Sequence, residues 1–576
     1  PNTLKILHWS GGPDAASIDK RIEFIKDWNK EYYEYLNNIA KFEETIVTSN
    51  TDTNASLSSP LDDDKSQMLK QKNILNEFQR PPTLSEKLVQ GVTWNAVGNF
   101  STLFFTLFLS IYLTRVLGSY HYGLWSILIS FIGIVVVIFN FGFDFTLNRY
   151  IPELKHKNLE NEIRPLLKKM VITKMLATVI LAPVLFFGRE EIAQYVFHDS
   201  LMVDVLPVLA LVLYLFVVEG IARAVLASYY EQKFLNIAEA FQRLIIIVSV
   251  YLLLRWKLEV LSVLLGYSIG QGLFLLICLT KILTITPPSK SNRSSISFHS
   301  FALSMYCLTV LTFVLGPQLD ILMLSLLRIE PEEIALYSIG FYLAYMATSL
   351  FPMLLGGGIT LTFVSELYVD QKKEKLRQVH STMLEYMLFF NMPIAVGGII
   401  VGYELITLLY SVEFSEAYLI FSLYLLLMIL LKLGGITSTF LAAMDKEHEL
   451  LMARTLAGTL NVFLNLFLII EWGIIGAVFA TGISGIIGTA WEFIMVHRMV
   501  KPKIPFIFLL KTLSSTSLMG LITWSFMSLI HLNVFFSIVI SGVLYFLFQY
   551  FLDPFSNDTK DFFSESKVPF SSFLKT

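Results

Sequence analysis

The chain has 576 residues, 55% of them hydrophobic, with a formal net charge of −3 and only 15% charged residues. Soluble globular domains carry about 25% charged residues, so this composition, with a mean hydropathy of +0.62, excludes a soluble protein and indicates many membrane spans. The two cysteines, Cys278 and Cys307, lie in apolar runs. Neither a disulfide framework nor a zinc site is therefore available, and we expect no cofactor.

Residues 1–86 form a polar head that precedes the apolar part of the chain. Apolar residues spaced three or four apart over 18–46 predict an amphipathic helix, and a linker rich in Ser, Thr, Asn and Asp follows at 48–66. The head lacks the pattern of a cleaved leader, so we expect it to be retained. We expect it to be cytoplasmic, and either to lie on the inner leaflet or to pair with a partner.

From Gly91 to Leu552, apolar stretches follow one another, each long enough to cross ~30 Å of hydrocarbon as a helix. They predict an all-α polytopic membrane protein with about fourteen transmembrane helices. The predicted spans are 92–114, 122–147, 170–187, 203–228, 236–254, 259–280, 300–327, 335–364, 382–402, 417–443, 453–471, 474–497, 506–530 and 533–552.

The connections between these spans are alternately rich and poor in Lys and Arg. Connections after even-numbered spans carry 19 of them, counting Arg454 at the start of the span 453–471, and those after odd-numbered spans carry 5. Because cytoplasmic loops are rich in Lys and Arg, we expect a multi-pass protein of the inner (plasma) membrane with both termini cytoplasmic. The longest outer connection is 188–202, too short for the external catalytic loop of a membrane glycosyltransferase, polymerase or ligase. No G-x-x-x-x-G-K-[ST] loop occurs, so ATP is not the direct energy source.

Several pairs of similar segments occur in the same order in the two halves of the chain. They include YGLWSI at 122–127 with ALYSIG at 335–340, VLASYYEQK at 225–233 with FLAAMDKEH at 440–448, and RW at 255–256 with EW at 471–472. These pairs predict two six-helix bundles that are parallel repeats and rock to give alternating access. The predicted domains are the head 1–86, the bundles 87–285 and 286–498, and 499–576 with two extra helices and a cytoplasmic tail.

Three stretches carry a resemblance to a known family: TLNVFLNLFLIIEWGIIGAVFATGIS (459–484), YLTRVLGSYHYGLWSI (112–127) and LDILMLSLLRIEPEEIALYSIG (319–340). They resemble polysaccharide-exporting flippases, above all Wzx-like O-antigen flippases, within the multidrug, oligosaccharidyl-lipid and polysaccharide exporter superfamily. The resemblance covers about 85–552 and implies a MATE-like fold.

This resemblance also implies a function and a set of partners. The expected activity is translocation of a polyprenyl-pyrophosphate-linked oligosaccharide by a transporter that is not an enzyme. Expected partners are the lipid-linked oligosaccharide, membrane lipids and a glycan polymerase or glycosyltransferases, with no nucleic acid; we expect a monomer. The alternative is an ion-coupled multidrug or metabolite antiporter of the same superfamily.

Charged residues inside the apolar spans are expensive and are therefore candidate sites. The candidates for binding a pyrophosphate are Arg149, Lys174, Arg223, Arg243 and Lys432, because guanidinium and ammonium groups bind phosphate oxygens. In the alternative interpretation Arg223 and Arg243 form i,i+4 ion pairs with Glu219 and Glu239. Lys174 and Lys432 have no acid at i+4, which we expect to leave positive charge for an anionic ligand.

The stretch GPQLDILML at 316–324 places a proline and an acid within an apolar span. Pro317 predicts a kink or a break, with freed backbone carbonyls beside Asp320. One interpretation gives Asp320, together with Glu219, a role in ion coupling through a proton or Na⁺; the other makes Asp320 the cap of the resumed helix. The expected depths of Asp320 and Lys432 differ by about 12 Å along the membrane normal. This difference argues against a direct ion pair between the two residues.

Overall fold

The computed structural model describes residues 84–288, 298–349, 364–503, 505–530, 533–557 and 559–560. The chain divides into two units, Pro1–Ser85 and Glu86–Thr576. The amphipathic helix and linker predicted for the head lie outside the described residues. The boundaries predicted at 285 and 498 stay a prediction.

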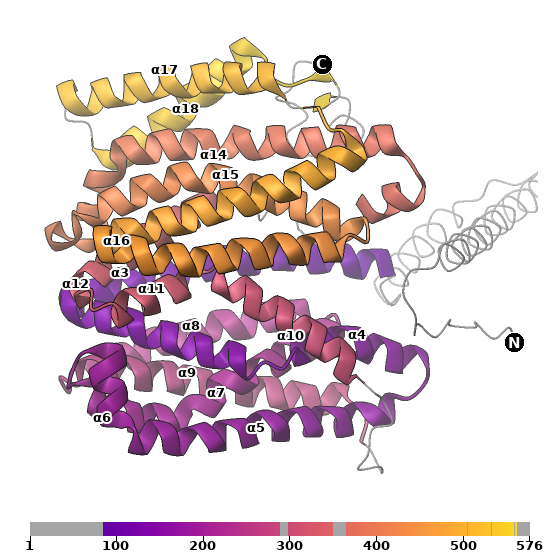
Figure 1. The fold of residues 1–576 in the computed structure, drawn as a ribbon, viewed down its shortest axis with the longest axis vertical. Helices are drawn as coiled ribbons and strands as arrows, with labels where there is room; N and C mark the ends of the chain where they lie inside the picture. Colours follow the sequence, from indigo (N-terminus) through magenta and orange to yellow (C-terminus); the bar gives the residue numbers. More distant parts are fainter. Residues whose placement is uncertain are drawn as a thin grey trace, which may run out of the picture. The chain divides into compact units, whose positions relative to one another are not determined.

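The described part of the chain is helical and contains no strand, which confirms the all-α class (Figure 1). The first half holds α3 (Leu84–Ile138), α4 (Phe143–His156), η1 (Glu160–Glu162), α5 (Ile163–Phe187), α6 (Arg189–Ile192), η2 (Ala193–Phe197), α7 (Met202–Ser228), α8 (Gln232–Leu254) and α9 (Glu259–Ile285). The second half holds α10 (His299–Val314), α11 (Pro317–Leu326), α12 (Pro331–Ser349), α14 (Lys373–Tyr410), η4 (Val412–Phe414), α15 (Ala417–Ala443) and α16 (Glu447–Val500). Two further helices follow, α17 (Phe506–Ile530) and α18 (Val534–Leu552), and both pack against α14.

Two of these helices, α3 and α16, are hairpins that turn at a glycine. A straight helix would separate residues 20 positions apart by ~30 Å, yet the Asn461 amide donates to Thr481 Oγ1 at 3.1 Å. The break in α16 is Gly473, with φ 55°. In α3 the break is Gly118, with φ 73°. Only glycine adopts these backbone conformations at low cost, so each glycine joins two antiparallel helical legs.

Ten of the described helices are long and apolar enough to cross a membrane, or eleven if the bent pair α10 and α11 is one span. Two of the ten are the hairpins of α3 and α16. Helix α12 is described only as far as Ser349, so the predicted span 335–364 lies partly outside the described residues. The count of fourteen therefore stays a prediction.

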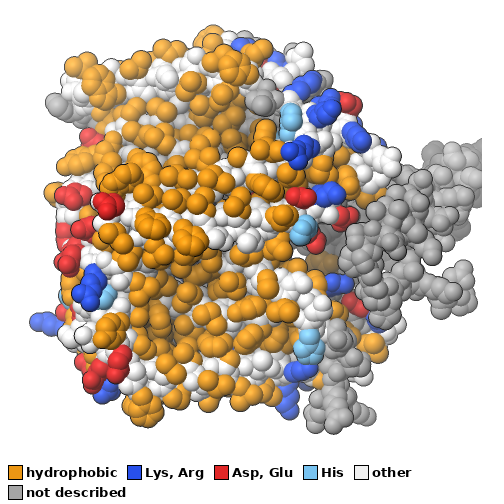
Figure 2. Space-filling view, viewed as in Figure 1, with side chains coloured by type: hydrophobic (Ala, Val, Ile, Leu, Met, Phe, Trp, Pro, Cys, Tyr) orange, Lys and Arg blue, Asp and Glu red, His pale blue; other side chains and the backbone are white. Residues whose placement is uncertain are grey.

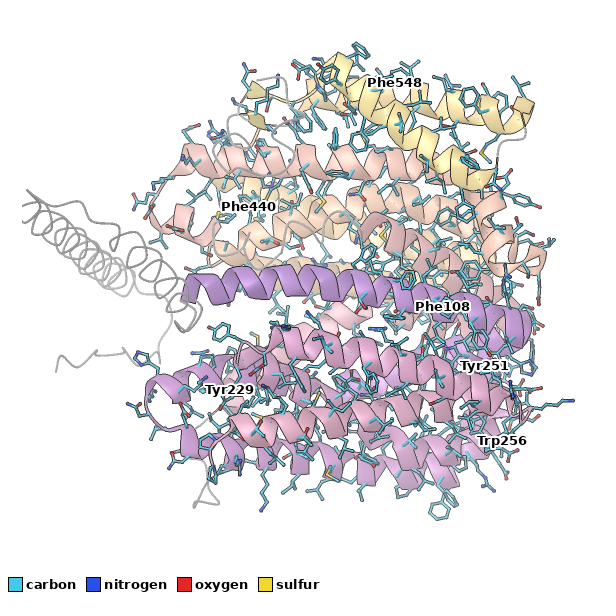
Figure 3. All side chains as sticks on the ribbon, turned by 180° about the vertical axis from the view of Figure 1, so that it is seen from behind. Phe108, Tyr229, Tyr251, Trp256, Phe440 and Phe548 are labelled. Carbon is cyan, nitrogen blue, oxygen red and sulfur yellow. The ribbon has the colours of Figure 1, made fainter. Side chains whose placement is uncertain are left out.

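The surface has the pattern of a multi-pass membrane protein. On the face shown in Figure 2, hydrophobic side chains cover the middle and charged side chains gather at the two edges. Tyr251 and the 70% exposed Trp256 lie at one end of the helices, and Tyr229 lies at the other (Figure 3). Tyr and Trp are enriched at membrane–water interfaces, so the helices cross the membrane between these two levels.

We name the two ends by their charge. The acidic end carries α6, η4 and the start of α12, with Glu190, Glu191, Glu330, Glu332, Glu333, Glu413 and Glu416. The basic end carries the α4–α5 connection, the start of α14 and the end of α16, with Lys155, Lys157, Lys168, Lys169, Lys373, Arg377, Arg498 and Lys501. By the predicted topology the basic end is cytoplasmic.

The two halves share one large hydrophobic core near the acidic end, whereas near the basic end the clusters are smaller and only the start of α10 joins the second half to the first. The shared core combines α3 and α7–α9 with α11, α12 and α14–α16. At the basic end, one cluster joins α4, α5 and α7 with the start of α10, and another joins α14, α15 and α16. The halves are therefore closed against each other at the acidic end.

Candidate functional site

The span that contains GPQLD is broken, as the sequence predicts. Helices α10 and α11 meet at an angle of 61°. Pro317 is the first residue of α11, where its missing N–H costs nothing. Gly316 ahead of it is extended, with φ −94° and ψ 160°. The break starts a new helix one turn before Asp320 and fixes the direction of its side chain.

Asp320 is fully buried and lies at the centre of a polar cluster. Its Oδ1 accepts a hydrogen bond from the Asn465 amide at 2.8 Å. Its Oδ2 accepts from Thr481 Oγ1 at 2.6 Å and from the Tyr337 hydroxyl at 2.7 Å. The N-cap of α11 is Gly316, without a side-chain cap, so the cap interpretation of Asp320 is wrong: its carboxylate bonds to three other helical segments.

A second set of residues holds these three donors in place. The Tyr424 hydroxyl lies 2.5 Å from that of Tyr337. The Asn465 amide also donates to Asn461 Oδ1 at 3.1 Å, while Asn465 Oδ1 is buried without a partner. We call Asp320, Tyr337, Tyr424, Asn461, Asn465 and Thr481 the Asp320 cluster. The carboxylate, amide and hydroxyl oxygens of the Asp320 cluster are the ligands that hard cations take.

Sequence reasoning found only the centre of this cluster. Asn461 and Asn465 belong to the Asn-x-x-x-Asn motif and Thr481 to the Ala-Thr pair of 459–484, which indicated the family and were given no chemical role. Their i,i+4 spacing places both amides on one helix face. Two amide side chains on one helix face within an apolar span were the sequence signal that could have indicated a polar site.

Lys432 lies apart from the Asp320 cluster, as expected from its depth. Its Nζ donates to Ser349 Oγ at 2.7 Å and lies 4.5 Å from the centre of the Tyr345 ring. Both partners are on α12. No carboxylate of the described residues pairs with Lys432.

In the first half, Arg223 lies between two carboxylates. Its Nε donates to Glu219 at 2.7 Å, which confirms that predicted pair, and its Nη1 pairs with Glu239 on α8. The predicted pair of Glu239 with Arg243 is therefore wrong, because Glu239 lies within reach of Arg223 across the helix interface. Arg243 instead donates to Thr106 Oγ1 at 2.9 Å, and its Nε is buried without a partner.

The contacts of Lys174 and Arg149 also differ from those expected of a basic site. Lys174 is 1% exposed, and its Nζ lies 3.5 Å from Asp144 Oδ1 and 3.1 Å from the Val217 carbonyl. The expectation that Lys174 leaves its charge free for a ligand is wrong, since the acid comes from another helix. Arg149 is exposed and stacks over the Phe301 ring at 4.5 Å.

The five predicted basic residues are thus not brought together as one site. Lys174 and Arg223 are held by carboxylates, whereas Arg149, Arg243 and Lys432 form no ion pair with a described acid. In the described first half, Asp144, Glu219 and Glu239 thus neutralise Lys174 and Arg223, and less positive charge is free than the sequence predicted.

Comparison with known proteins adds a family and a fold. Residues 88–349 match the polysaccharide biosynthesis protein family. Over these residues the chain is similar to that family. No curated protein matches the sequence of the chain.

Solved structures match it over most of its length. A lipid II flippase in an inward closed conformation is 18% identical, with a TM-score of 0.62 over 82% of this chain and 100% of that one. An inward-facing multidrug resistance MATE transporter of the MOP superfamily is 13% identical, with a TM-score of 0.56 over 70% and 96%. A MOP superfamily transporter from Pyrococcus furiosus is 13% identical, with a TM-score of 0.52 over 73% and 97%. At these identities the match shows the fold, which is MATE-like.

Proposed function

We propose that the chain translocates a polyprenyl-pyrophosphate-linked oligosaccharide across the cytoplasmic membrane by alternating access, for the biosynthesis of O-antigen, exopolysaccharide or a related glycan. The observation that carries this proposal is the match of residues 88–349 to the polysaccharide biosynthesis protein family. The shared fold with a lipid II flippase supports it.

The distribution of the hydrophobic cores supports the transport mechanism. The halves share a large core near the acidic end and, apart from the start of α10, pack separately near the basic end. If one half rocks against the other, the acidic end opens and the basic end closes. A lipid-linked cargo would bind from the cytoplasmic, basic end in this state and leave after the acidic end opens.

Two basic residues, one from each half, are the best candidates to contact the pyrophosphate. Arg243 and Lys432 are partly buried, and among the described residues their side chains hydrogen-bond only to hydroxyls, those of Thr106 and Ser349. A pyrophosphate oxygen would replace those hydroxyls with a charge-assisted hydrogen bond. Arg223 and Lys174 are held by acids, so we assign them to the structure of the first half.

The first test measures cargo flipping by the full-length chain reconstituted in liposomes with a fluorescent polyprenyl-pyrophosphate oligosaccharide. Arg243→Ala and Lys432→Ala should each lower the flipping rate by about tenfold or more, the loss expected for a charge-assisted hydrogen bond. Lys373→Ala, at the exposed start of α14, is the control and should flip normally. Unchanged flipping in both variants would overturn the assignment.

We further propose that Asp320 couples flipping to a cation gradient. A ligand shifts the equilibrium between two conformational states only if it binds them with different affinities. The donors of Asp320 come from α12 and both legs of α16, so any shift between these helices changes the site. Glu219 is held by Arg223 and is not proposed for this role.

Imposed proton and Na⁺ gradients across the same liposomes test the coupling. Flipping by the unmodified chain should respond to one of them, and Asp320→Asn should abolish that response while cargo binding remains. A gradient response that persists in Asp320→Asn would remove Asp320 from coupling.

The acids of the first half favour one alternative, an ion-coupled antiporter for cationic compounds. Asp144, Glu219 and Glu239 supply acids there, which a cation could use. Gradient-driven export of a cationic dye, without flipping of the lipid-linked oligosaccharide, would support this alternative instead.

A further inference from the structure

A cavity extends from the Asp320 cluster toward the basic end. Its volume is about 170 Å³, enough for several water molecules. One wall is a single face of the second leg of α16: Thr481, Gly485, Gly488, Thr489 and Glu492. Thr481 and Glu492 are eleven residues apart, ~16 Å along the helix.

The other walls come from three segments. Ala453, Arg454 and Ala457 belong to the first leg of α16, Leu431 and Gly434 belong to α15, and Leu315 lies in the break between α10 and α11. Small side chains line most of the cavity, and that is why space remains between these packed helices. We call it the α15–α16 cavity.

The inner end of the α15–α16 cavity is part of the Asp320 cluster. Thr481 lines the cavity and donates directly to Asp320 Oδ2 at 2.6 Å. Anything of the size of water in the cavity is therefore one side chain away from the buried carboxylate.

The outer end carries a second carboxylate. Glu492 is only 2% exposed; its Oε2 accepts from Ser438 Oγ at 2.6 Å, and its Oε1 lies 3.3 Å from Arg454 Nε. Charge-assisted hydrogen bonds of this kind are normally about 2.7–2.9 Å long, so the direct pair is long. Arg454 Nη2 also donates to Ser438 Oγ at 2.8 Å. The Arg454 side chain is 32% exposed, and its displacement would free Glu492 for another cation.

We propose that the α15–α16 cavity is the path by which a monovalent cation, Na⁺ or a proton carried by water, reaches Asp320 from the basic end, with Glu492 as the first carboxylate that it meets. Arg454 is the counter-ion that the arriving cation displaces. This inference rests on the proposed coupling role of Asp320 and adds the route and a second cation-binding residue to it.

Cysteine labelling tests whether water fills the cavity. In the full-length chain with Cys278→Ser and Cys307→Ser, a Thr489→Cys variant in liposomes should react with a small cationic methanethiosulfonate reagent. The neighbouring Ala490 faces outward, so Ala490→Cys is the matched control and should react slowly in the bilayer. Equal, slow reaction at both positions would overturn a hydrated path.

Exchange rates test whether the cavity is the route to Asp320. Ala457→Leu fills the cavity and should slow both the exchange of radioactive ²²Na⁺ and proton uptake by about tenfold or more, with equilibrium binding unchanged. Arg454→Ala should accelerate exchange, and it is a second variant without added volume if Ala457→Leu overpacks the helices. Ala490→Leu, on the outward face of the same leg, should exchange at the rate of the unmodified chain.

The outcomes separate the route from the coupling. If Asp320→Asn abolishes cation binding but Ala457→Leu and Arg454→Ala both exchange at the unmodified rate, the coupling stands and the route is wrong. If Asp320→Asn binds and responds as the unmodified chain does, the coupling fails and the route to Asp320 fails with it. Whichever of Na⁺ and protons is exchanged identifies the cation.

Discussion

At the scale of single residues, the partners of charged groups are set by neighbouring helices more often than by the sequence around them. The i,i+4 rule found Glu219 with Arg223. It missed Asp144 with Lys174 and Glu239 with Arg223, because both acids reach across a helix interface. Sequence spacing reports only contacts within one helix, so it overestimated the free positive charge of the first half.

Lys174 provides a test of this structural assignment. Lys174→Met keeps most of the volume but leaves Asp144 without its cation, so stability should fall by about 1–3 kcal/mol. The double variant Lys174→Met with Asp144→Asn should recover that loss, because no unpaired charge remains. Thermal unfolding in detergent measures both, and flipping in liposomes is the second readout.

The double variant distinguishes structure from substrate binding. A stable double variant that flips cargo normally supports the structural role of Lys174. A stable double variant that cannot flip cargo would return Lys174 to the pyrophosphate site.

At the scale of elements, apolar runs and local breakers predicted most of the architecture. Run length located the helices, and Pro317 located the break between α10 and α11. The sequence also separated the legs of both hairpins, at 114–122 and 471–474, where Gly118 and Gly473 take positive φ. It could not predict that one leg of α16 supplies Asn465 and the other supplies Thr481 to the same carboxylate, because that depends on how three segments pack.

The hairpin of α16 makes a second prediction. Gly473 has φ 55° and ψ −133°, a conformation that costs other residues about 1–3 kcal/mol. Gly473→Ala should therefore lower stability by that amount and loosen the Asp320 cluster, since the two legs carry its donors.

Gly435 is the matched control, at which we expect an added methyl group to raise stability. Gly435 lies inside α15 with nothing within 4 Å of an added Cβ, so Gly435→Ala should raise stability by up to about 1 kcal/mol. Chemical unfolding of both variants in micelles measures the difference. Loss of equal size at both positions would show that the turn at Gly473 carries no special strain.

At the scale of the whole molecule, the closed acidic end is held by contacts between the halves. Arg115 Nε donates to the Leu409 carbonyl at 2.8 Å, and the Ser119 N–H donates to Glu413 Oε1 at 2.8 Å. Gly123 of α3 lies so close to α12 that an added Cβ would come within 1.8 Å of the Pro331 carbonyl oxygen. These contacts exist only while the acidic end is closed.

A methyl group at Gly123 should open that end. Gly123→Ala cannot be accommodated against the backbone of Pro331, so the equilibrium should shift toward the state that is open at the acidic end. Spin labels at the exposed residues Tyr195 and Val412 would report a longer distance by pulsed electron resonance. Gly133→Ala, whose Cβ would make ordinary contact with Phe313 at 3.5 Å, is the control. An unchanged distance in Gly123→Ala would mean that the two halves do not separate at this contact.

The paired segments of the sequence indicated two similar halves, and one pair can be followed in the structure. Trp256 lies two residues after the end of α8, and Trp472 ends the first leg of α16 before Gly473; both are exposed. The charged and polar groups of the two halves do not share this similarity. The Asp320 cluster and the α15–α16 cavity belong to the second half, whereas three ion-paired acids lie in the first.

The separation of the Asp320 cluster along the chain also sets an order for biosynthesis. Asn465 and Thr481 follow Asp320 by 145 and 161 residues, which takes roughly 10–30 s at ribosomal rates of about 5–20 residues per second. During that time Asp320 lacks two of its three donors, and an acid at the centre of a bilayer costs about 2.5–3.5 kcal/mol. The newly made α10–α11 segment must therefore wait in the insertion machinery or near the lipid headgroups, and it can settle only after α16 has been translated. A nascent chain that stops before α16 exposes this unpaired acid, and membrane quality control can recognise it.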